Sequence, residues 1–259
     1  MKTMKKVVAF MLAVVMSMSL MACGSKGVSL EDVKKAGKLT IATSPDFPPF
    51  EYLEGEEIVG IEIEIMEKVA EELGVELEIK DMAFDSILQA VQAGKYNVGV
   101  SGITITPERQ KNADFTTPYF MASQAIVVMA DSDIKTKADL DGKKISVQTG
   151  TTAEDYCMKE GYNVNAFEAN NDAMLALTTG KVDALVIDNE VAIDLSEKEN
   201  GKTVVLEEKM TSEPYGFGFA KGSDTLVAEI DKLIKEWIAD GTIEAIFDKY
   251  EVPYVAPEN

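Results

Sequence analysis

The sequence GVSGITITPER, residues 99–109, joins an apolar segment typical of a strand to the first turn of a helix. Thr106 can cap this helix through its side-chain oxygen, and the proline that follows suits the first helical position. Arg109 lies in the first turn, beside backbone amides that have no partner within the helix. Together with the hydroxyl groups of Ser101 and Thr104, these donors can hold a small anion such as a carboxylate. The stretch by itself is equally consistent with a capped helix whose arginine faces solvent.

The segments around this stretch alternate between strand and helix. Apolar runs predict the strands, and apolar residues at helical spacing with a glycine at the end predict the helices. The expected strands are 39–43, 75–79 and 96–100, and the expected helices are 30–35, 60–73 and 84–93. This alternation is typical of a parallel sheet, which places ligands at the carboxyl ends of its strands. The loops 44–50 and 101–106 both follow such ends.

The pattern restarts after residue 119. Strands are expected at 125–129 and 145–148, and the stretch 173–184 resembles 87–98 in its helix, glycine and strand. An internal repeat of this kind predicts two similar lobes, so the predicted fold class is α/β with a ligand cleft between the lobes. The C-terminal part adds an expected strand at 215–220, a helix at 226–239 and a final helix that ends at residue 250.

The N-terminus has the pattern of a targeting signal. Lysines at positions 2, 5 and 6 precede an apolar run from residue 7 to 21, which predicts a signal peptide over residues 1–22 and is short for a membrane span. The ending Leu-Met-Ala-Cys resembles a bacterial lipobox, in which Cys23 is lipidated and becomes the first residue. An ordinary secretory signal with a chance cysteine is the alternative. A lipid on Cys23 and a tether over 23–29 would hold the protein at the outer face of the cell membrane.

Composition excludes several classes of function. The net charge is −20, and removal of residues 1–22 takes away three lysines and leaves −23, so nucleic acid is not expected as a partner. No histidine is present, which removes the commonest general base and metal ligand. Neither a cofactor nor a metal site is expected, and the glutamates at 62, 64 and 67 are interpreted as acidic surface. Cys157 has no second cysteine in the mature chain and is interpreted as a packed small residue.

The motifs together resemble those of a known family, the extracytoplasmic solute-binding proteins that serve ABC importers of polar amino acids. The motifs are PPFE at 48–51, Gly60 with acids at 62 and 64, GITITPER at 102–109, DFTTPY at 114–119, GTT at 150–152 and Ile-Asp at 187–188. The resemblance covers nearly the whole mature chain and implies two α/β lobes joined by crossing segments near 121–124 and 213–216. Lobe 1 would contain residues 30–121 and 217–259, and lobe 2 residues 122–216.

The resemblance also implies a site for the part that all amino acids share. Arg109 would pair with the α-carboxylate, helped by Thr104 and by the backbone N–H of Thr152. Asp188 and the carbonyl of Gly102 would take the α-ammonium. Both ligand charges are desolvated in a closed cleft, so each needs a partner of opposite charge. The expected aromatic walls are Phe47 and Phe84, with Phe50 close behind.

The side-chain pocket leaves two ligand classes open. Glu62 can pair with the cationic head of arginine or lysine, with an aromatic wall adding cation-π attraction, or it can face solvent like its acidic neighbours. Ser44, Ser101 and Gln148 form a neutral polar set that suits glutamine, cystine or another uncharged polar side chain. A cationic amino acid is ranked slightly first.

The expected mechanism is capture by closure, because contacts from both lobes exist together only in a shut cleft. A monomer would then deliver the free amino acid to a membrane permease that recognises the closed form. Two other classes stay open. The same architecture is known in periplasmic dehydratases acting on prephenate-like acids, which would need a protonated carboxyl on Asp188 or Glu62. A sensor domain that feeds a receptor partner is the other class.

Overall fold

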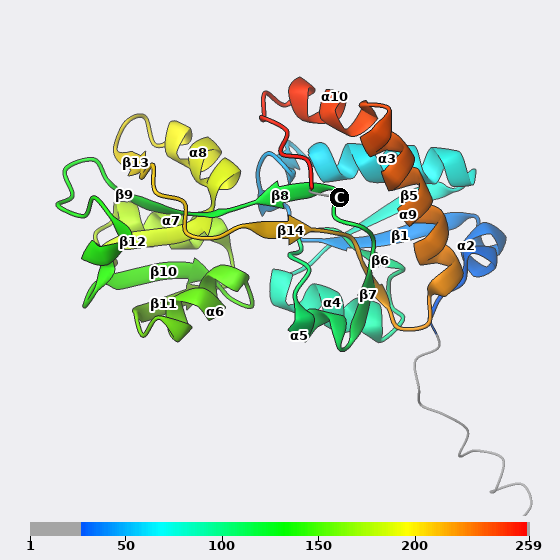
Figure 1. The fold of residues 1–259 in the computed structure, drawn as a ribbon, viewed down its shortest axis with the longest axis horizontal. Coiled ribbons are helices and arrows are strands. Elements are labelled where there is room, and N and C mark those ends of the chain that lie inside the picture. The colour runs from blue at the N-terminus through cyan, green and yellow to red at the C-terminus, as the bar shows by residue number, and fades with distance from the viewer. Residues whose placement is uncertain (1–26, 258–259) are drawn as a thin grey trace, which may run out of the picture.

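The computed structural model describes residues 27–257, which form two α/β lobes placed side by side (Figure 1). This arrangement confirms the predicted fold class. The expected signal peptide and the expected lipidation site Cys23 lie outside the described residues. Within 27–257, no helix combines the length and the apolar character that a membrane crossing requires.

The first lobe is built on a five-stranded sheet. Its strands are β1 (Lys38–Thr43), β5 (Glu76–Asp81), β6 (Val98–Gly99), β7 (Ala113–Phe115) and β15 (Gly218–Ala220), in the order β5-β1-β6-β15-β7. β1 pairs in parallel with β5 and β6, as the strand and helix alternation predicts. β15 comes from late in the chain and pairs antiparallel with β6 and β7. Segments from both ends of the sequence therefore complete one sheet.

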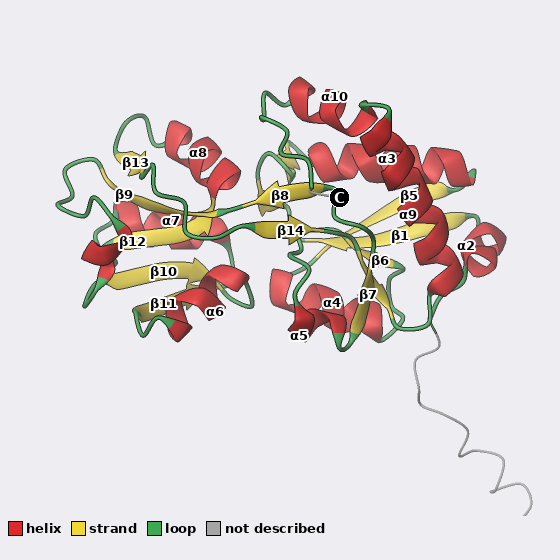
Figure 2. Cartoon of the chain, viewed as in Figure 1, coloured by secondary structure: helices red, strands yellow, loops and turns green. Residues whose placement is uncertain are grey.

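Helices cover both faces of this sheet (Figure 2). They are α2 (Leu30–Ala36), α3 (Ile61–Leu73), α4 (Phe84–Gln92), the single turn α5 (Pro107–Gln110), α9 (Asp224–Ala239) and α10 (Thr242–Lys249). The expected helices at 30–35, 60–73 and 84–93 are confirmed. A small hairpin sheet, β2 (Asp46–Phe47), β3 (Glu51–Glu54) and β4 (Glu57–Val59), precedes α3. This hairpin brings the loop after β1 back over the end of the sheet.

The second lobe repeats the plan with a sheet of its own. Its strands are β9 (Gln124–Met129), β10 (Lys144–Gln148), β11 (Asn163–Phe167), β12 (Ala184–Asp188) and β13 (Thr203–Val205), in the order β11-β10-β12-β9-β13. Its helices are the 3-10 turn η1 (Lys137–Leu140), α6 (Thr152–Lys159), α7 (Asn170–Thr178) and α8 (Asn189–Lys198). β10, β11 and β12 run parallel, so their carboxyl ends meet at one edge. That edge faces the first lobe (Figure 1).

Two antiparallel strands connect the lobes. β8 (Phe120–Ala122) pairs with β14 (Glu213–Tyr215), and both lie between the two sheets in Figure 1. The prediction of a single strand over 215–220 is wrong. The chain forms two strands there and changes partner between them, since β14 pairs with β8 and β15 pairs with strands of the first sheet. Gly216 marks the change, since its N–H donates to the carbonyl of Ile103 and a Cβ there would lie 2.7 Å from the Ile105 side chain.

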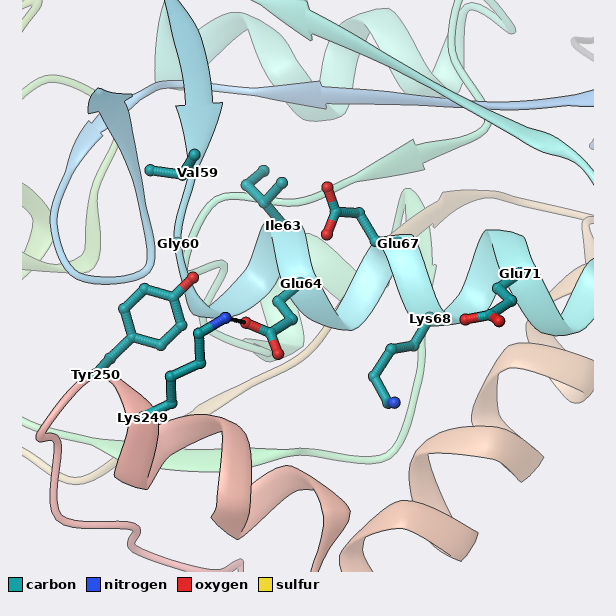
Figure 3. A pocket seen from close by; sticks show the side chains of 9 residues that line it. All are labelled: Val59, Gly60, Ile63, Glu64, Glu67, Lys68, Glu71, Lys249 and Tyr250. Carbon is teal, nitrogen blue, oxygen red and sulfur yellow. Dashed lines mark hydrogen bonds and ion pairs between the residues drawn. The ribbon is translucent and has the colours of Figure 1, made fainter. Parts of the chain in front are cut away.

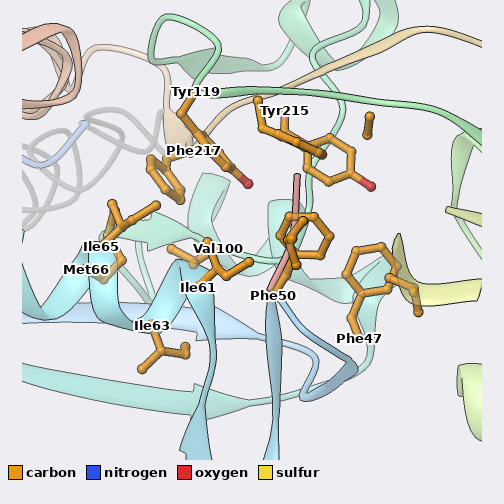
Figure 4. Close-up of a cluster of buried hydrophobic side chains, with 14 of the residues drawn as sticks. Phe47, Phe50, Ile61, Ile63, Ile65, Met66, Val100, Tyr119, Tyr215 and Phe217 are labelled. Carbon is orange, nitrogen blue, oxygen red and sulfur yellow. The ribbon is translucent and has the colours of Figure 1, made fainter. Parts of the chain in front are cut away.

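An aromatic cluster joins the first lobe, α10 and the crossing strands. Figure 4 shows Phe47, Phe50, Tyr119, Tyr215 and Phe217 from this region. Phe50 is fully buried, with ring centroids 5.5 Å from Tyr215, 5.6 Å from Phe120 and 6.2 Å from Phe247. Aromatic pairs at such distances stabilise by more than their buried area alone. The crossing strands are thus anchored firmly in the first lobe.

Candidate functional site

A small cavity lies between the lobes, at the point where the strand ends of both sheets face each other. Its lining comes from the loops after β1, β6, β10 and β12 and from the start of α4. The lining residues are Phe47, Phe84, Ser101, Gly102, Thr104, Arg109, Gln148, Thr151, Thr152 and Asp188. The strand ends that the sequence singled out therefore meet in one place.

Arg109 is held by the loop that the sequence predicted. Its backbone N–H donates to the Thr106 hydroxyl at 3.1 Å, which confirms the predicted cap of the short helix α5. The guanidinium donates to the carbonyl of Thr104 at 2.9 Å and to the carbonyl of Gly150, in the other lobe, at 3.0 Å. Its carbon lies 5.5 Å from the centre of the Phe84 ring. Burial lowers the pKa of Arg109, although nearby acids oppose this shift.

No carboxylate of the described residues forms a salt bridge with Arg109. It is also the only arginine in the whole sequence, in which every other basic residue is a lysine. A planar fork of donors thus faces the cavity with backbone carbonyls as its only hydrogen-bond partners in residues 27–257. This leaves a positive charge that a carboxylate can neutralise with two parallel hydrogen bonds.

The carboxyl group of Asp188 stands at the end of β12 and also lines the cavity. One carboxylate oxygen accepts from Gln124 Nε2 at 3.0 Å, and the other accepts from the Tyr215 hydroxyl. Burial, followed by the negative charge of Glu213, raises the pKa of Asp188 to about 8. No lysine or arginine in the described part of the chain forms a salt bridge with it. A cation in the cavity would stabilise its ionised form.

Hydroxyl groups join the two lobes beside these charges. Thr104 Oγ1, from the first lobe, donates to Glu213 Oε2 at 2.8 Å, and Thr152 Oγ1, from the second, donates to the same oxygen at 2.6 Å. Thr152 is the first residue of α6, so its backbone N–H is among those without an intrahelical acceptor. The hydroxyl of Thr151 caps this helix by accepting from the N–H of Glu154 at 3.2 Å. Glu213, on the crossing strand β14, thus links hydroxyl groups of both lobes.

A family model described as bacterial extracellular solute-binding proteins, family 3, matches residues 39–252. This chain belongs to that family. It is 31% identical to the L-cystine-binding protein TcyJ of Escherichia coli, over 92% of this chain and 91% of that protein. It is 32% identical to the arginine-binding extracellular protein ArtP of Bacillus subtilis, over 95% and 98%. The arginine-bound form of truncated ArgBP from T. maritima superposes with a TM-score of 0.77 at 38% identity, covering 80% of this chain and 99% of that one.

Most of the residues that the family resemblance singled out line the cavity. The nine are Phe47, Phe84, Ser101, Gly102, Thr104, Arg109, Gln148, Thr152 and Asp188. Gln148 is oriented by two hydrogen bonds, since its Nε2 donates to the carbonyl of Glu168 at 3.1 Å and its Oε1 accepts from Asn170 Nδ2 at 3.1 Å. The contacts that these residues would make with a ligand stay predictions.

Three expected residues lie elsewhere. Phe50 belongs to the aromatic cluster and not to the cavity, because the hairpin turns its ring toward the crossing strands. Ser44 lines an adjacent pocket and donates to Asp46 at 3.2 Å. Glu62 does not face solvent, so that expectation is wrong, and it is not among the residues that line the cavity; its pairing with a cationic ligand stays a prediction. It is fully buried, and its carboxylate accepts from the N–H of Gly102 at 2.9 Å and from the Tyr119 hydroxyl.

The other acidic residues of α3 do form a surface (Figure 3). Glu64 pairs with Lys249 of α10 at 2.5 Å, and Glu67 and Glu71 lie along the same groove. No group of acidic or cysteine side chains suited to a metal ion occurs among residues 27–257. Glu62 differs from these neighbours because helical spacing turns it toward the core, whereas an alternating strand would have kept it beside Glu64.

Two site residues were missed by the sequence analysis. Thr151 lines the cavity, although only its neighbour Thr152 was selected from the GTT motif. Glu213 accepts hydrogen bonds from threonines of both lobes, yet it carries no sequence signal beyond its place in an expected crossing segment. Its role depends on a contact across more than a hundred residues, which no local pattern encodes.

Proposed function

We propose that this protein binds a free polar amino acid between its lobes and delivers it to the permease of an ABC importer, with arginine or lysine preferred. The observation that carries the proposal is a guanidinium and a carboxyl group in one cavity, since a bound ammonium group stabilises the ionised form of that carboxyl. Neither Arg109 nor Asp188 forms a salt bridge among the described residues, and a zwitterion supplies a partner of opposite charge for each. The named relatives are themselves amino-acid-binding proteins.

The roles of the residues follow from their donors and acceptors. Arg109 takes the α-carboxylate with the help of Thr104 and the free backbone N–H of Thr152. Asp188 takes the α-ammonium together with the carbonyl of Gly102. Since the carboxylate site combines donors from both lobes, binding favours the closed form by its differential affinity for that form. The permease then has a shape to recognise that the empty, open protein lacks.

The preference for a cationic side chain rests on the surroundings of the cavity. Phe47 and Phe84 offer aromatic faces that attract a guanidinium or ammonium group. The adjacent pocket is acidic, since Asp46, Asp81 and Glu168 line it beside Ser44. Burial raises the pKa of Asp46, whose carboxylate accepts from the N–H of Asn170 in the second lobe at 2.5 Å. Neutral donors and acceptors on Gln148 and Ser101 keep glutamine or cystine as the second choice.

Thermal unfolding of residues 24–259 with each common amino acid tests the proposal, because a ligand of the native state raises the unfolding midpoint by mass action. Arginine or lysine is expected to raise it most. Arg109→Ala and Asp188→Ala should each abolish the shift, whereas Lys111→Ala, on the exposed side of the same turn, should keep it. Asp46→Asn should weaken arginine more than glutamine. If no amino acid shifts the wild-type midpoint, amino-acid binding is refuted.

A second candidate function is a dehydratase acting on a prephenate-like acid. One observation favours it: with a pKa of about 8, Asp188 holds a proton at neutral pH and could donate it to a leaving hydroxyl. Incubation of the wild-type protein with prephenate or arogenate, followed by detection of the aromatic product, separates the two functions. Product formation that disappears in Asp188→Asn would establish the enzyme.

Delivery to a permease also requires the protein to stay at the membrane. We propose that Cys23 is lipidated after removal of residues 1–22 and that the protein acts as a monomer outside the cytoplasm. Labelling of growing cells with a radioactive fatty acid tests this. The label should be found on the wild-type protein and be lost in Cys23→Ser, and a wild-type protein without label would refute the anchor.

A further inference from the structure

Two carboxyl groups lie beneath the floor of the cavity, where the proposed ligand roles do not use them. Glu51 of β3 and Glu62 of α3 are both fully buried. Their side chains interact with each other as hydrogen-bond partners and as like charges. No lysine or arginine of residues 27–257 forms a salt bridge with either one. A pair of buried acids without a cation is costly if both are ionised.

These carboxyls hold two consecutive residues of the cavity lining. Glu51 Oε1 accepts from the Ser101 hydroxyl at 2.7 Å, and Glu62 Oε2 accepts from the N–H of Gly102 at 2.9 Å. The Ser101 hydroxyl in turn accepts from the N–H of Ser44 at 3.2 Å. Gly102 has a φ of +51°, a conformation that side chains rarely adopt. The conformation of the loop at Ser101 and Gly102 therefore depends on hydrogen bonds accepted by the carboxyl groups of Glu51 and Glu62.

The donors and acceptors around the pair show where a proton belongs. Glu62 accepts from two protein donors, the N–H of Gly102 and the Tyr119 hydroxyl, and both favour its ionised form. Among the described residues, Glu51 accepts from Ser101 alone, and its second oxygen, Oε2, receives no donor from them. A proton on Glu51 would remove the repulsion, and the protonated carboxyl could donate a hydrogen bond to Glu62.

The other titratable groups around the pair also favour a proton on Glu51 and an ionised Glu62. Asp46, on β2, adds negative charge near Glu51, and Tyr119, before β8, donates to Glu62. Burial, then the charge of Glu62, raises the pKa of Glu51 well above its ordinary value. Burial also raises the pKa of Glu62, but its hydrogen-bond donors oppose the shift.

We infer that Glu51 and Glu62 share one proton at neutral pH and act as a positioning pair, with neutral Glu51 and ionised Glu62 holding Ser101 and Gly102 in the conformation that the amino-acid site requires. The inference about positioning rests on the proposed function. The shared proton does not, because it follows from the buried geometry alone. Neither residue touches the cavity, so their effect reaches the ligand through the loop.

Glutamine substitutions distinguish the two members of the pair. An amide at position 51 imitates a protonated carboxyl, since its oxygen accepts from Ser101 and its NH₂ donates to Glu62. An amide at position 62 offers one oxygen to three donors: the N–H of Gly102, the Tyr119 hydroxyl and the Glu51 proton. Glu51→Gln is therefore expected to keep the affinity for arginine within about threefold, and Glu62→Gln to lower it by roughly tenfold or more. Glu67→Gln, on the exposed face of the same helix, is the matched control.

Carbon-13 spectra of protein labelled at the glutamate carboxyl carbons measure the shared proton directly. In the wild-type protein at pH 7 one carboxyl carbon should keep the chemical shift of a protonated acid, and this resonance should be absent from Glu51→Gln. A role in packing alone would not produce that signal. Glutamate carboxyls that are all ionised at pH 7, or equal losses of affinity in Glu51→Gln and Glu62→Gln, would overturn the inference.

The two measurements also separate this inference from the proposed function. A wild-type protein that responds to no amino acid would refute amino-acid binding and with it the positioning role. The carboxyl spectrum would still decide the shared proton. If Glu62→Gln fails to fold, the retained affinity of Glu51→Gln and the wild-type spectrum still test the assignment of the proton to Glu51.

Discussion

The proposed role of Asp188 predicts that ligand binding depends on pH. Its pKa is raised to about 8 in the protein without ligand, chiefly because the carboxyl is buried. Binding of an α-ammonium group requires the ionised form, and the ammonium stabilises that form in the complex. Binding must therefore expel the proton that Asp188 carries at lower pH. Affinity should rise as pH increases toward 8.

The size of the change in affinity with pH follows from the fraction of ligand-free protein in which Asp188 is ionised. With a pKa of about 8, this fraction is roughly one in ten at pH 7 and roughly one in a hundred at pH 6. The dissociation constant for arginine should therefore increase about tenfold for each unit of pH below 8. At pH 7, binding should release about 0.9 proton per molecule of ligand.

Isothermal titration calorimetry at several pH values measures both quantities. Titrations at pH 7 in phosphate and in Tris, whose ionisation enthalpies differ, give the number of protons released. Asp188→Asn should bind more weakly at pH 8 and show a flat profile, while Asp172→Asn, an exposed aspartate at the start of α7, should behave like the wild type. A wild-type dissociation constant that changes less than twofold between pH 6 and pH 8, without proton release, would refute this account of Asp188.

Three further predictions concern stability and reactivity. A Cβ at position 102 would lie 2.5 Å from the Phe47 ring and 3.1 Å from that of Tyr215, so Gly102→Ala should lower the free energy of unfolding by about 1–3 kcal/mol, measured by guanidinium denaturation. Phe50→Ala should cost about 3–5 kcal/mol in the same assay because it empties the centre of the aromatic cluster; a loss under 1 kcal/mol would contradict that placement. Burial raises the pKa of Cys157 to about 12, so the native thiol should not react with Ellman's reagent at pH 8 and should react after unfolding.

Asp188 also affects folding, with a sign opposite to its effect on binding. Its pKa in the folded protein lies above the ordinary value of 3.8, so the stability it contributes is present below pH 4 and is lost as pH rises to 8. The unfolding midpoint of the ligand-free wild type, relative to that of Asp188→Asn, should therefore be lower at pH 8 than at pH 6. Differential scanning calorimetry of both proteins at the two pH values measures this difference, and a constant difference would contradict the raised pKa.

The sequence by itself determined the local elements and two charged residues that line the cavity, Arg109 and Asp188. Apolar spacing and terminal glycines placed α3 and α4, and the repeat of one helix-glycine-strand pattern indicated two lobes. The position of Arg109 was predictable because Thr106 caps the turn that carries it, although one partner of the guanidinium, the carbonyl of Gly150, comes from the other lobe. Asp188 was predictable because a strand end in such a sheet faces the ligand cleft.

Only the tertiary structure decided the roles of side chains whose partners are distant in the sequence. Glu62 and Glu64 look alike in a charged stretch, yet helical spacing buries one against Gly102 and Tyr119 and leaves the other beside Lys249. Glu213 gains its partners from two lobes, and Phe50 becomes core because β14 and α10 pack over it. Local spacing fixes which face of an element a residue occupies, but burial and hydrogen bonding depend on what the rest of the chain packs against that face.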